Sequence, residues 1–346
     1  MSTDAPRTRF RDSQIEMAHG AGGKASRRLV EGLFAPLFFP ASTEPLSDAA
    51  HLTLNGVRIA ITADSFVVKP LRFPGGSIGE LAVNGTVNDL AVSGARAEAL
   101  VVTFVLEAGL PSEVLEAEAR AMAQAAAKAG VVIAGGDTKV VENGKADRMY
   151  ITTAGIGCPM PELNLSAASV RPGDKVLLSG PVGDHGVTIL LARGELDLEA
   201  ELCSDTRSVL PMVEAIALAA GPGVRWMRDP TRGGLATSLN ELARDAGVGV
   251  RLAEESIPLR DAVRGACELL GLDPLHIANE GQFVAIIAPE HADAALEALR
   301  ASPGGGEAAL IGEIREQPVA TVLGAASYGG TRVIDMLVGD PLPRIC

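Results

Sequence analysis

Residues 78–92 read IGELAVNGTVNDLAV, and this stretch combines a helical composition with a carboxylate in apolar surroundings. Its Ala and Leu residues predict a helix that ends before Gly94. The apolar residues around Asp89 indicate that the helix is largely buried, and a buried carboxylate is costly unless it is paired or bound to a metal ion. The stretch therefore predicts a core helix that carries a binding residue.

Strand-like and helical segments alternate on either side of this helix. The β-branched residues 57–62 predict a strand before it, and residues 100–106 predict a strand after it. An Ala- and Glu-rich helix closed by a glycine is expected over residues 111–129, followed by strands at 131–134 and 150–155. The order strand, helix, strand, helix, strand, strand predicts a mixed α/β layer.

A second unit begins after Pro159-Met160-Pro161, where residues 175–179 predict a strand followed by a glycine-rich loop and a helix. Further strands are predicted at 224–227, 249–252 and 283–288, and further helices at 234–246 and 291–301. A chain of 346 residues is long enough for two domains. The expected parts are an N-terminal arm with a glycine-rich loop, two domains and a C-terminal tail, at residues 1–40, 41–160, 161–338 and 339–346.

The composition excludes several classes of function. A net charge of −13 argues against nonspecific binding of nucleic acid, which needs a basic surface. The start of the chain has no apolar signal core, and no stretch approaches the roughly 18 apolar residues of a membrane span. The four cysteines are far apart and form no C-x-x-C pair. We expect a cytoplasmic protein that binds neither nucleic acid nor membrane, with reduced thiols.

Three aspartates each lie at the edge of an otherwise apolar run: Asp64, Asp89 and Asp137. Each one alone is explained equally well as a cap or turn residue. Mg²⁺ bound to nucleotide phosphates takes a few carboxylate oxygens and keeps water or phosphate oxygens as its other ligands. Together, three carboxylates from three segments predict such a magnesium site.

Three glycine-rich loops offer backbone N–H groups to an anion. The His19–Lys24 loop adds a lysine, although it lacks the spacing of a P-loop and also reads as a flexible linker. The loops Gly180–Gly186 and Asp229–Gly234 both follow predicted strands and precede predicted helices, as anion sites and ordinary turns both do. Lys139 and Glu280 lie next to strands and are candidates for proton transfer or for a structural ion pair.

The chain stops at Cys346, after Pro341-Leu342-Pro343-Arg344-Ile345. Two prolines favour an extended approach to the thiol. Such a tail suits an arm that carries a sulfur nucleophile into a pocket, and it also fits a frayed end that happens to finish in Cys. Arg344 would favour the thiolate, which the terminal carboxylate opposes.

These motifs together identify a family resemblance that runs essentially from end to end. The chain resembles the HypE hydrogenase maturation factors, which belong to the PurM-like (aminoimidazole ribonucleotide synthetase-type) ATP-dependent enzymes. The resemblance rests on these segments: His19–Lys24, Thr62–Lys69, Phe73–Gly76 through Asn84–Ala91, Gly135–Val140, Asp229–Gly234 and Pro343–Cys346. It implies an α/β (α+β) fold with an N-terminal ATP- and Mg²⁺-binding domain, a C-terminal α/β domain and a homodimer.

The resemblance also implies a reaction. In this family a separate carbamoyltransferase, HypF, loads a carbamoyl group onto the terminal cysteine, and ATP drives its dehydration to a thiocyanate. The cyanide then passes to iron held by the HypC–HypD complex and becomes a ligand of the nickel–iron site of hydrogenase. The residues implied are Cys346, Glu280 and Lys139 for catalysis, Lys24, Asn88, Thr138, Asp229 and Arg232 for ATP, and Asp64, Asp89 and Asp137 for Mg²⁺.

Two other functions remain open at this stage. A PurM-like kinase or synthetase for a small metabolite, such as thiamine-monophosphate kinase or selenophosphate synthetase, would share the aspartates and have no use for Cys346. A carrier or scaffold would use the tail to dock to partners and hand over a group made elsewhere. Release of ADP and phosphate with loss of water distinguishes the enzyme from the carrier.

Overall fold

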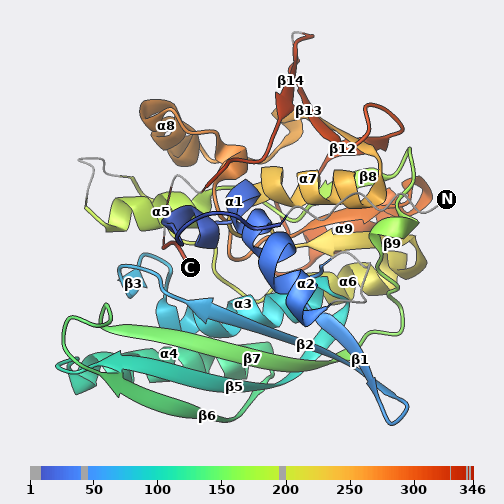
Figure 1. Cartoon of the computed structure of the whole chain (residues 1–346). Helices are drawn as coiled ribbons and strands as arrows, with labels where there is room; N and C mark the ends of the chain where they lie inside the picture. The colour runs from blue at the N-terminus through green and yellow to red at the C-terminus, as the bar shows by residue number, and fades with distance from the viewer. Residues whose placement is uncertain (1–8, 40–45, 195–199, 328, 340–341, 343) are drawn as a thin grey trace.

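The computed structural model describes residues 9–39, 46–194, 200–327, 329–339, 342 and 344–346, which form two α/β halves preceded by a helical arm (Figure 1). The arm runs through η1 (Met17–Gly20), α1 (Gly23–Leu29), η2 (Val30–Phe34) and α2 (Ala35–Phe38). It crosses from the C-terminal half to the near edge of the N-terminal sheet.

The N-terminal half is built on a five-stranded sheet with the order β1-β2-β7-β5-β6. Only β5 and β6 pair in parallel. The strands are β1 (Ala50–Leu54), β2 (Val57–Phe66), β5 (Ala95–Glu107), β6 (Val132–Val141) and β7 (Met149–Pro159). A small hairpin of β3 (Arg72–Phe73) and β4 (Gly76–Ser77) leads into α3 (Ile78–Val92). Helices α3 and α4 (Ser112–Ala129) cover one face of the sheet.

The C-terminal half holds a seven-stranded sheet with the order β14-β13-β10-β12-β8-β11-β9. Its strands are β8 (Lys175–Leu178), β9 (Val224–Arg228), β10 (Gly249–Ala253), β11 (Val284–Ile287), β12 (Ala309–Arg315), β13 (Thr321–Ala325) and β14 (Thr331–Ile334). Its helices are α5 (Asp184–Ala192), α6 (Leu210–Ala220), α7 (Gly234–Ala246), α8 (Asp261–Leu270) and α9 (Ala292–Ala301). Strand β11 is buried along its whole length.

Helix α3 lies between the two halves, which explains why it is apolar on every side. It packs on β2, β5 and β7 of its own sheet and contacts α6 of the other half. Glu80 and Asp89 are its only residues that are not buried. A helix enclosed in this way needs no polar face, so the sequence IGELAVNGTVNDLAV fits the position.

The opposite face of the N-terminal sheet has no helix of the described residues on it. Side chains that alternate with the core residues point to this face, including Ile61, Val101 and Ile156, which are 37%, 48% and 40% exposed. The edge strands β1 and β6 are exposed along almost their whole length. This sheet face is called the open face below. No helix in the described part of the chain is long and apolar enough to cross a membrane.

Candidate active site

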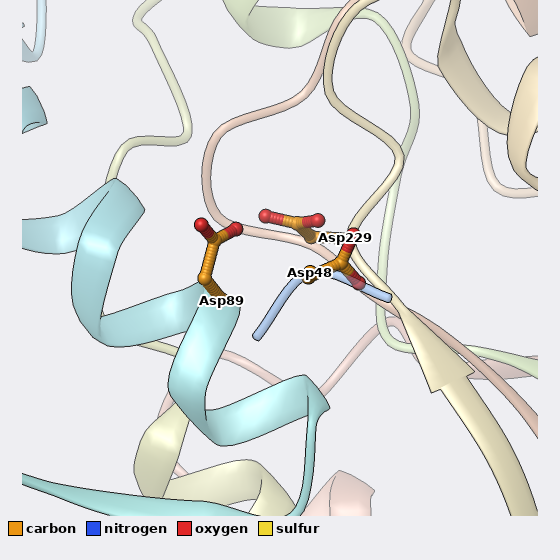
Figure 2. Close-up of side chains that lie close together, drawn as sticks. All are labelled: Asp48, Asp89 and Asp229. Atoms are coloured by element: carbon orange, nitrogen blue, oxygen red, sulfur yellow. The ribbon is translucent and has the colours of Figure 1, made fainter. Parts of the chain in front are cut away.

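Three carboxylates meet where the two halves face each other (Figure 2). Asp48 precedes β1, Asp89 lies on α3, and Asp229 follows β9. One oxygen of each lies within 4.8 Å of the others. Figure 2 shows the three side chains turned toward a common space beside α3. Carboxylate oxygens at this separation suit a hard divalent cation, so the residues present fit Mg²⁺.

The electrostatics of this carboxylate cluster agree with a cation site. Burial raises the pKa of Asp89 well above its ordinary value, and the charges of Asp229, Asp48 and Asp64 raise it further. Burial and Asp48 likewise raise the pKa of Asp229 well above the usual range. Arg228, whose Nε lies 3.2 Å from Asp48 Oδ2, offsets only part of this repulsion. The cluster therefore stores like-charge repulsion that a bound cation would relieve.

Asp64 and Asp89 were both expected to be metal ligands. Asp89 is a member of the cluster. Asp64, on β2, lies near enough for its charge to act on Asp89, while its Oδ1 is 4.0 Å from Arg232 Nη2. The hydroxyl of Thr62, two residues before Asp64, lies 2.9 Å from Asp89 Oδ2 and 2.7 Å from the carbonyl oxygen of Asp48. Strand β2 thus holds the cluster from one side.

Asp137, Thr138 and Lys139 all lie on β6, at the far edge of the sheet from β1. Across the sheet, Asp64 on β2 lies in line with Thr153 on β7 and Gly136 on β6. Asp64 is therefore three strand spacings, roughly 14 Å, from this segment. Asp137 pairs in register with Thr103 on the open face and binds Lys139 through its carboxylate. Within one chain, Asp89 of the predicted metal set therefore clusters with Asp48 and Asp229, Asp64 lies near this cluster, and Asp137 lies away from it.

The glycine-rich loop lies beside Arg232. The guanidinium of Arg232 donates to the carbonyl of Gly20 at 2.8 Å, and a Cβ on Gly22 would lie 2.8 Å from the Arg232 carbonyl oxygen. Gly22 and Gly23 both have positive φ, at 78° and 74°, so only glycine fits here without strain. Lys24 donates from its ammonium to the exposed carboxylate of Asp335.

A cavity of about 1330 Å³ connects this loop with the carboxylate cluster. Its lining includes the loop, Arg228, Arg232 and the aspartates Asp48 and Asp229. Backbone N–H groups, cations and metal-binding carboxylates therefore face one space, which is the combination that a nucleotide triphosphate requires. Lys24, Asp229 and Arg232, three of the predicted ATP-binding residues, all line it.

Glu280 is 4% exposed, and its Oε1 has no hydrogen-bond partner among the described residues. Burial raises its pKa well above the ordinary value, the charges of Asp229, Asp64 and Asp205 add to the shift, and Arg232 opposes them. The backbone around it is fixed, because the Asp205 carboxylate accepts from the N–H groups of Glu280 and Gly281 at 3.0 and 3.2 Å. The predicted partner Lys139 lies on β6 instead.

Asn88 has a different position from the one predicted. It is 1% exposed, and its amide nitrogen donates to the carbonyls of Arg207 (2.9 Å) and Glu280 (3.2 Å). Its oxygen accepts from the N–H of Val209 at 2.8 Å. In place of the predicted contact with ATP, the Asn88 amide joins α3 to the C-terminal half and holds the Glu280 backbone.

The last two residues lie inside the molecule, and Arg344 before them is partly exposed. Ile345 and Cys346 are 1% and 8% exposed. The carbonyl of Cys346 accepts from the N–H of Val67 at 2.9 Å, so the tail runs beside the segment that follows β2. The charge of Cys346 is the largest cause of the raised pKa of Arg232, ahead of Asp64, Glu280 and Asp89. The cysteine therefore shares one site with them, although Pro341 and Pro343 lie outside the described residues.

Two residues of the site were not expected from the sequence. Asp48 lies in a turn without a recognisable motif, and Arg228 lies at the end of a strand with no motif that marks it as functional. Their proximity depends on how the two halves pack, which no local pattern encodes. The only sequence signal was the buried Asp89, which required counter-charges or a metal ion from elsewhere.

Comparison with known proteins places the chain. Residues 46–158 match the family model for the N-terminal domain of AIR synthase related proteins, and residues 171–324 match the model for the C-terminal domain. The carbamoyl dehydratase HypE of Azotobacter vinelandii is 49% identical over 337 residues, covering 97% of this chain and 98% of that protein.

The chain belongs to the HypE family.

Solved HypE structures have the same fold. The HypE–HypF complex contains a chain that is 42% identical, with a TM-score of 0.84 over 89% of this chain and 99% of that one. A HypE structure in complex with ATP is 44% identical, with a TM-score of 0.80 over 96% of this chain and 100% of that one. The two-domain PurM-like α/β fold expected from the sequence is thereby confirmed.

Proposed function

We propose that this member of the HypE family is a carbamoyl dehydratase that uses ATP to convert an S-carbamoyl group on Cys346 into a thiocyanate, which supplies cyanide for the nickel–iron site of hydrogenase. The observation that carries the proposal is the docked tail: Cys346 is buried, its carbonyl accepts from the N–H of Val67 just after β2, and its charge acts on Arg232. The names of the relatives, carbamoyl dehydratases, support the same reaction.

The cavity beside the glycine-rich loop is the proposed site for ATP, as the ATP complex of a relative supports. Lys24 and Arg232 would meet the phosphates, together with the N–H groups of the loop. Mg²⁺ held by Asp48, Asp89 and Asp229 would neutralise phosphate charge. Phosphoryl transfer depends mainly on such positioning and charge neutralisation.

The reaction proceeds through an activated oxygen. The carbamoyl oxygen forms a bond to the γ-phosphorus while the bond from that phosphorus to the β,γ-bridging oxygen breaks, releasing ADP. The carbon–oxygen bond then breaks, phosphate leaves, and the nitrogen loses both protons as the C≡N bond forms. The negative charge at Cys346 acts on Arg232, so this guanidinium would stabilise charge that develops near the loaded cysteine.

Glu280 is the proposed proton acceptor. Its raised pKa makes its carboxylate a stronger base than an exposed glutamate. Within the described part of the chain, its Oε1 has no hydrogen bond that would compete with a proton from the substrate. The Asn88 and Asp205 contacts fix its backbone, so the carboxyl group is presented in one place.

The open face supports a homodimer. Apolar side chains from adjacent strands are exposed together there, and large exposed apolar patches mark interfaces. Asp137 and Lys139 lie on the same face, so a role for them in catalysis or metal binding requires a second copy of the chain. HypF is the proposed source of the carbamoyl group, as the complex of a relative supports. The HypC–HypD partnership and the cytoplasmic location stay predictions from the sequence.

Intact-protein mass spectrometry tests the proposal. The protein is incubated with carbamoyl phosphate, ATP and a HypF carbamoyltransferase, freed of nucleotide, and then given MgATP. We expect one carbamoyl group on the C-terminal peptide, followed by loss of one water only when ATP is present. Cys203→Ser is the matched control and should behave as wild type. Carbamoylation elsewhere than Cys346, or no loss of water, would contradict the proposal.

A further inference from the structure

A series of hydrogen bonds between buried polar side chains has no part in the chemistry described so far. One end of it contacts the C-terminal tail. His185, on the first turn of α5, is fully buried. Its Nε2 lies 2.6 Å from the carbonyl oxygen of Ile345, the residue next to Cys346. Its Nδ1 lies 2.7 Å from the hydroxyl of Ser204. Figure 1 shows the C-terminus beside α5 and β3, in agreement with these contacts.

The direction of each hydrogen bond in this chain is fixed. Burial lowers the pKa of His185 to about 4, so the imidazole is neutral and has one N–H. A carbonyl oxygen can only accept, so that N–H is on Nε2 and donates to Ile345. Nδ1 must then accept from the Ser204 hydroxyl, whose oxygen accepts from the N–H of Thr206 at 3.1 Å. The Ile345 carbonyl thus fixes the tautomer, and the Ser204 hydroxyl holds the ring through Nδ1.

The surroundings hold the imidazole in place. The ring of Phe73 packs edge-on against His185, with centroids 5.6 Å apart and planes at 87°. The N–H of Ser204 donates to the carbonyl of Pro74 at 2.9 Å. A Cβ on Gly75 would lie 2.8 Å from the Ser204 carbonyl oxygen, so the two segments are in direct contact. The donor is pre-oriented before the tail arrives.

The tail's other hydrogen bonds differ in kind. Arg344 and Cys346 accept at their carbonyls from groups of the segment after β2 and from Arg193, whose Nη2 is 2.8 Å from the Arg344 oxygen. The Arg344 side chain donates to the Val67 carbonyl at 3.1 Å and to the Asp147 carboxylate at 2.8 Å. These partners lie at or near the surface, where water can replace the tail. The N–H of His185 points to a position that the buried Ile345 fills. Losing a partner costs most for a buried donor.

We propose that His185, oriented by Ser204, is the positioning residue that holds residues 344–346 in the active site, and that its contact with Ile345 sets the balance between the docked and undocked tail. This inference rests on the proposed function and adds to it that Cys346 is loaded outside the site and dehydrated inside it. The two ring nitrogens of His185 are bonded to Ile345 and Ser204, so its effect on the reaction passes through the tail.

The first test measures docking without any chemistry of the proposed reaction. Iodoacetamide alkylates a thiol only when it is accessible, so the rate at Cys346 reports the undocked fraction. The buried Cys267, on α8, is the internal reference for loosening of the fold. In His185→Leu, which keeps an apolar body against Phe73, we expect alkylation of Cys346 to accelerate about ten- to hundred-fold while Cys267 stays protected.

The second test measures the reaction. In single-turnover assays of carbamoylated protein with MgATP, His185→Leu should slow dehydration by a similar factor, whereas carbamoylation and ATP affinity stay at wild-type values. His185→Gln keeps an N–H donor at the end of its side chain and should restore part of the rate. Ser204→Ala removes only the orienting hydroxyl and should show a smaller effect in the same direction, which provides a milder variant if His185→Leu fails to fold.

The outcomes separate the two proposals. Unchanged alkylation of Cys346 in both His185→Leu and Ser204→Ala overturns the positioning role, as does a parallel rise at the buried Cys267, which would mean general loosening. If wild-type protein never loses water with MgATP, the proposed function fails, and the alkylation result still decides whether His185 holds the tail.

Discussion

At the residue scale, each carboxylate of the cluster lowers the stability of the fold, because it is buried beside other negative charges. Asp89 lies on a helix with apolar neighbours on every side, and burial together with Asp229, Asp48 and Asp64 raises its pKa. Such an arrangement stabilises a bound cation, and it lowers the stability of the protein when no cation is bound. The stability of the metal-free chain and its metal affinity are therefore opposed at this one position.

Asp89→Asn should separate these two effects. Because the amide removes the repulsion, we expect the metal-free protein to be more stable by about 1 kcal/mol. The increase in Tm on adding Mg²⁺ should disappear, since a ligand is lost. Differential scanning fluorimetry in EDTA and in increasing Mg²⁺ measures both. Glu113→Gln, at the start of α4, is the control, and an undiminished Mg²⁺ effect in Asp89→Asn would exclude Asp89 as a ligand.

Glu280→Gln tests the proton acceptor. The amide keeps the size of the side chain but cannot take a proton, so conversion of S-carbamoyl to thiocyanate should slow by about 10²- to 10⁴-fold. Binding of ATP should change little, because Glu280 is not a phosphate contact in the proposed site. Single-turnover mass spectrometry gives the rate, and isothermal calorimetry gives the affinity. A wild-type rate in this variant would remove Glu280 from the mechanism.

The residue scale also marks the limit of sequence reasoning. Asp89 could be recognised because its helix is apolar all round, and Glu280 because it lies next to a predicted strand in a segment that fits the family resemblance. Asp48 and Arg228 could not, since they become neighbours only when the two halves pack. Asn88 was misassigned for the same reason: its three hydrogen bonds reach across to Arg207, Val209 and Glu280.

At the element scale, periodicity predicted most of the helices well. The predicted helix over 78–92 has the bounds of α3, and that over 234–246 has those of α7. Strand β6 was cut short, because Gly135 and Gly136 suggested a loop after residue 134 and the strand continues to Val141. Strands β12, β13 and β14 were not predicted. Glycine in a strand marks a close approach of backbones as often as a turn.

Gly136 makes such an approach. A Cβ there would lie 1.8 Å from the carbonyl oxygen of Val102 on β5, whereas a Cβ on Gly135 would meet nothing within 4 Å. Gly136→Ala should therefore push β6 away from β5 and lower the free energy of unfolding by about 2 kcal/mol or more. Gly135→Ala is the matched control and should stay near wild type. Urea unfolding of both variants decides, and equal stabilities would contradict the close approach of the two strands at Gly136.

At the scale of the whole molecule, no helix of the described residues covers the open face of the N-terminal sheet. Both edge strands and the apolar side chains between them are exposed, which a monomer rarely sustains. The fold therefore has its catalytic cavity between the two halves and its proposed interface on the opposite side of the N-terminal sheet.

Ile156→Glu should convert the protein to a monomer. Burying a carboxylate in an apolar interface costs more than the interface gains from the neighbouring contacts. We expect sedimentation equilibrium to give the mass of a dimer for wild type and of one chain for the variant. Leu269→Glu, on α8 of the C-terminal half, places the same charge at a residue that is 71% exposed and should remain dimeric. A dimeric Ile156→Glu would place the interface elsewhere.

The docked tail also determines the rate law. A substrate that is covalently part of its own catalyst cannot be diluted away, and a short tether gives it a local concentration of about millimolar or more. Dehydration should then be first order in loaded protein and independent of how much protein is present. A free thiocarbamate would need to exceed that local concentration to compete. Selectivity thus comes from attachment, and the site has little need to recognise the small carbamoyl group itself.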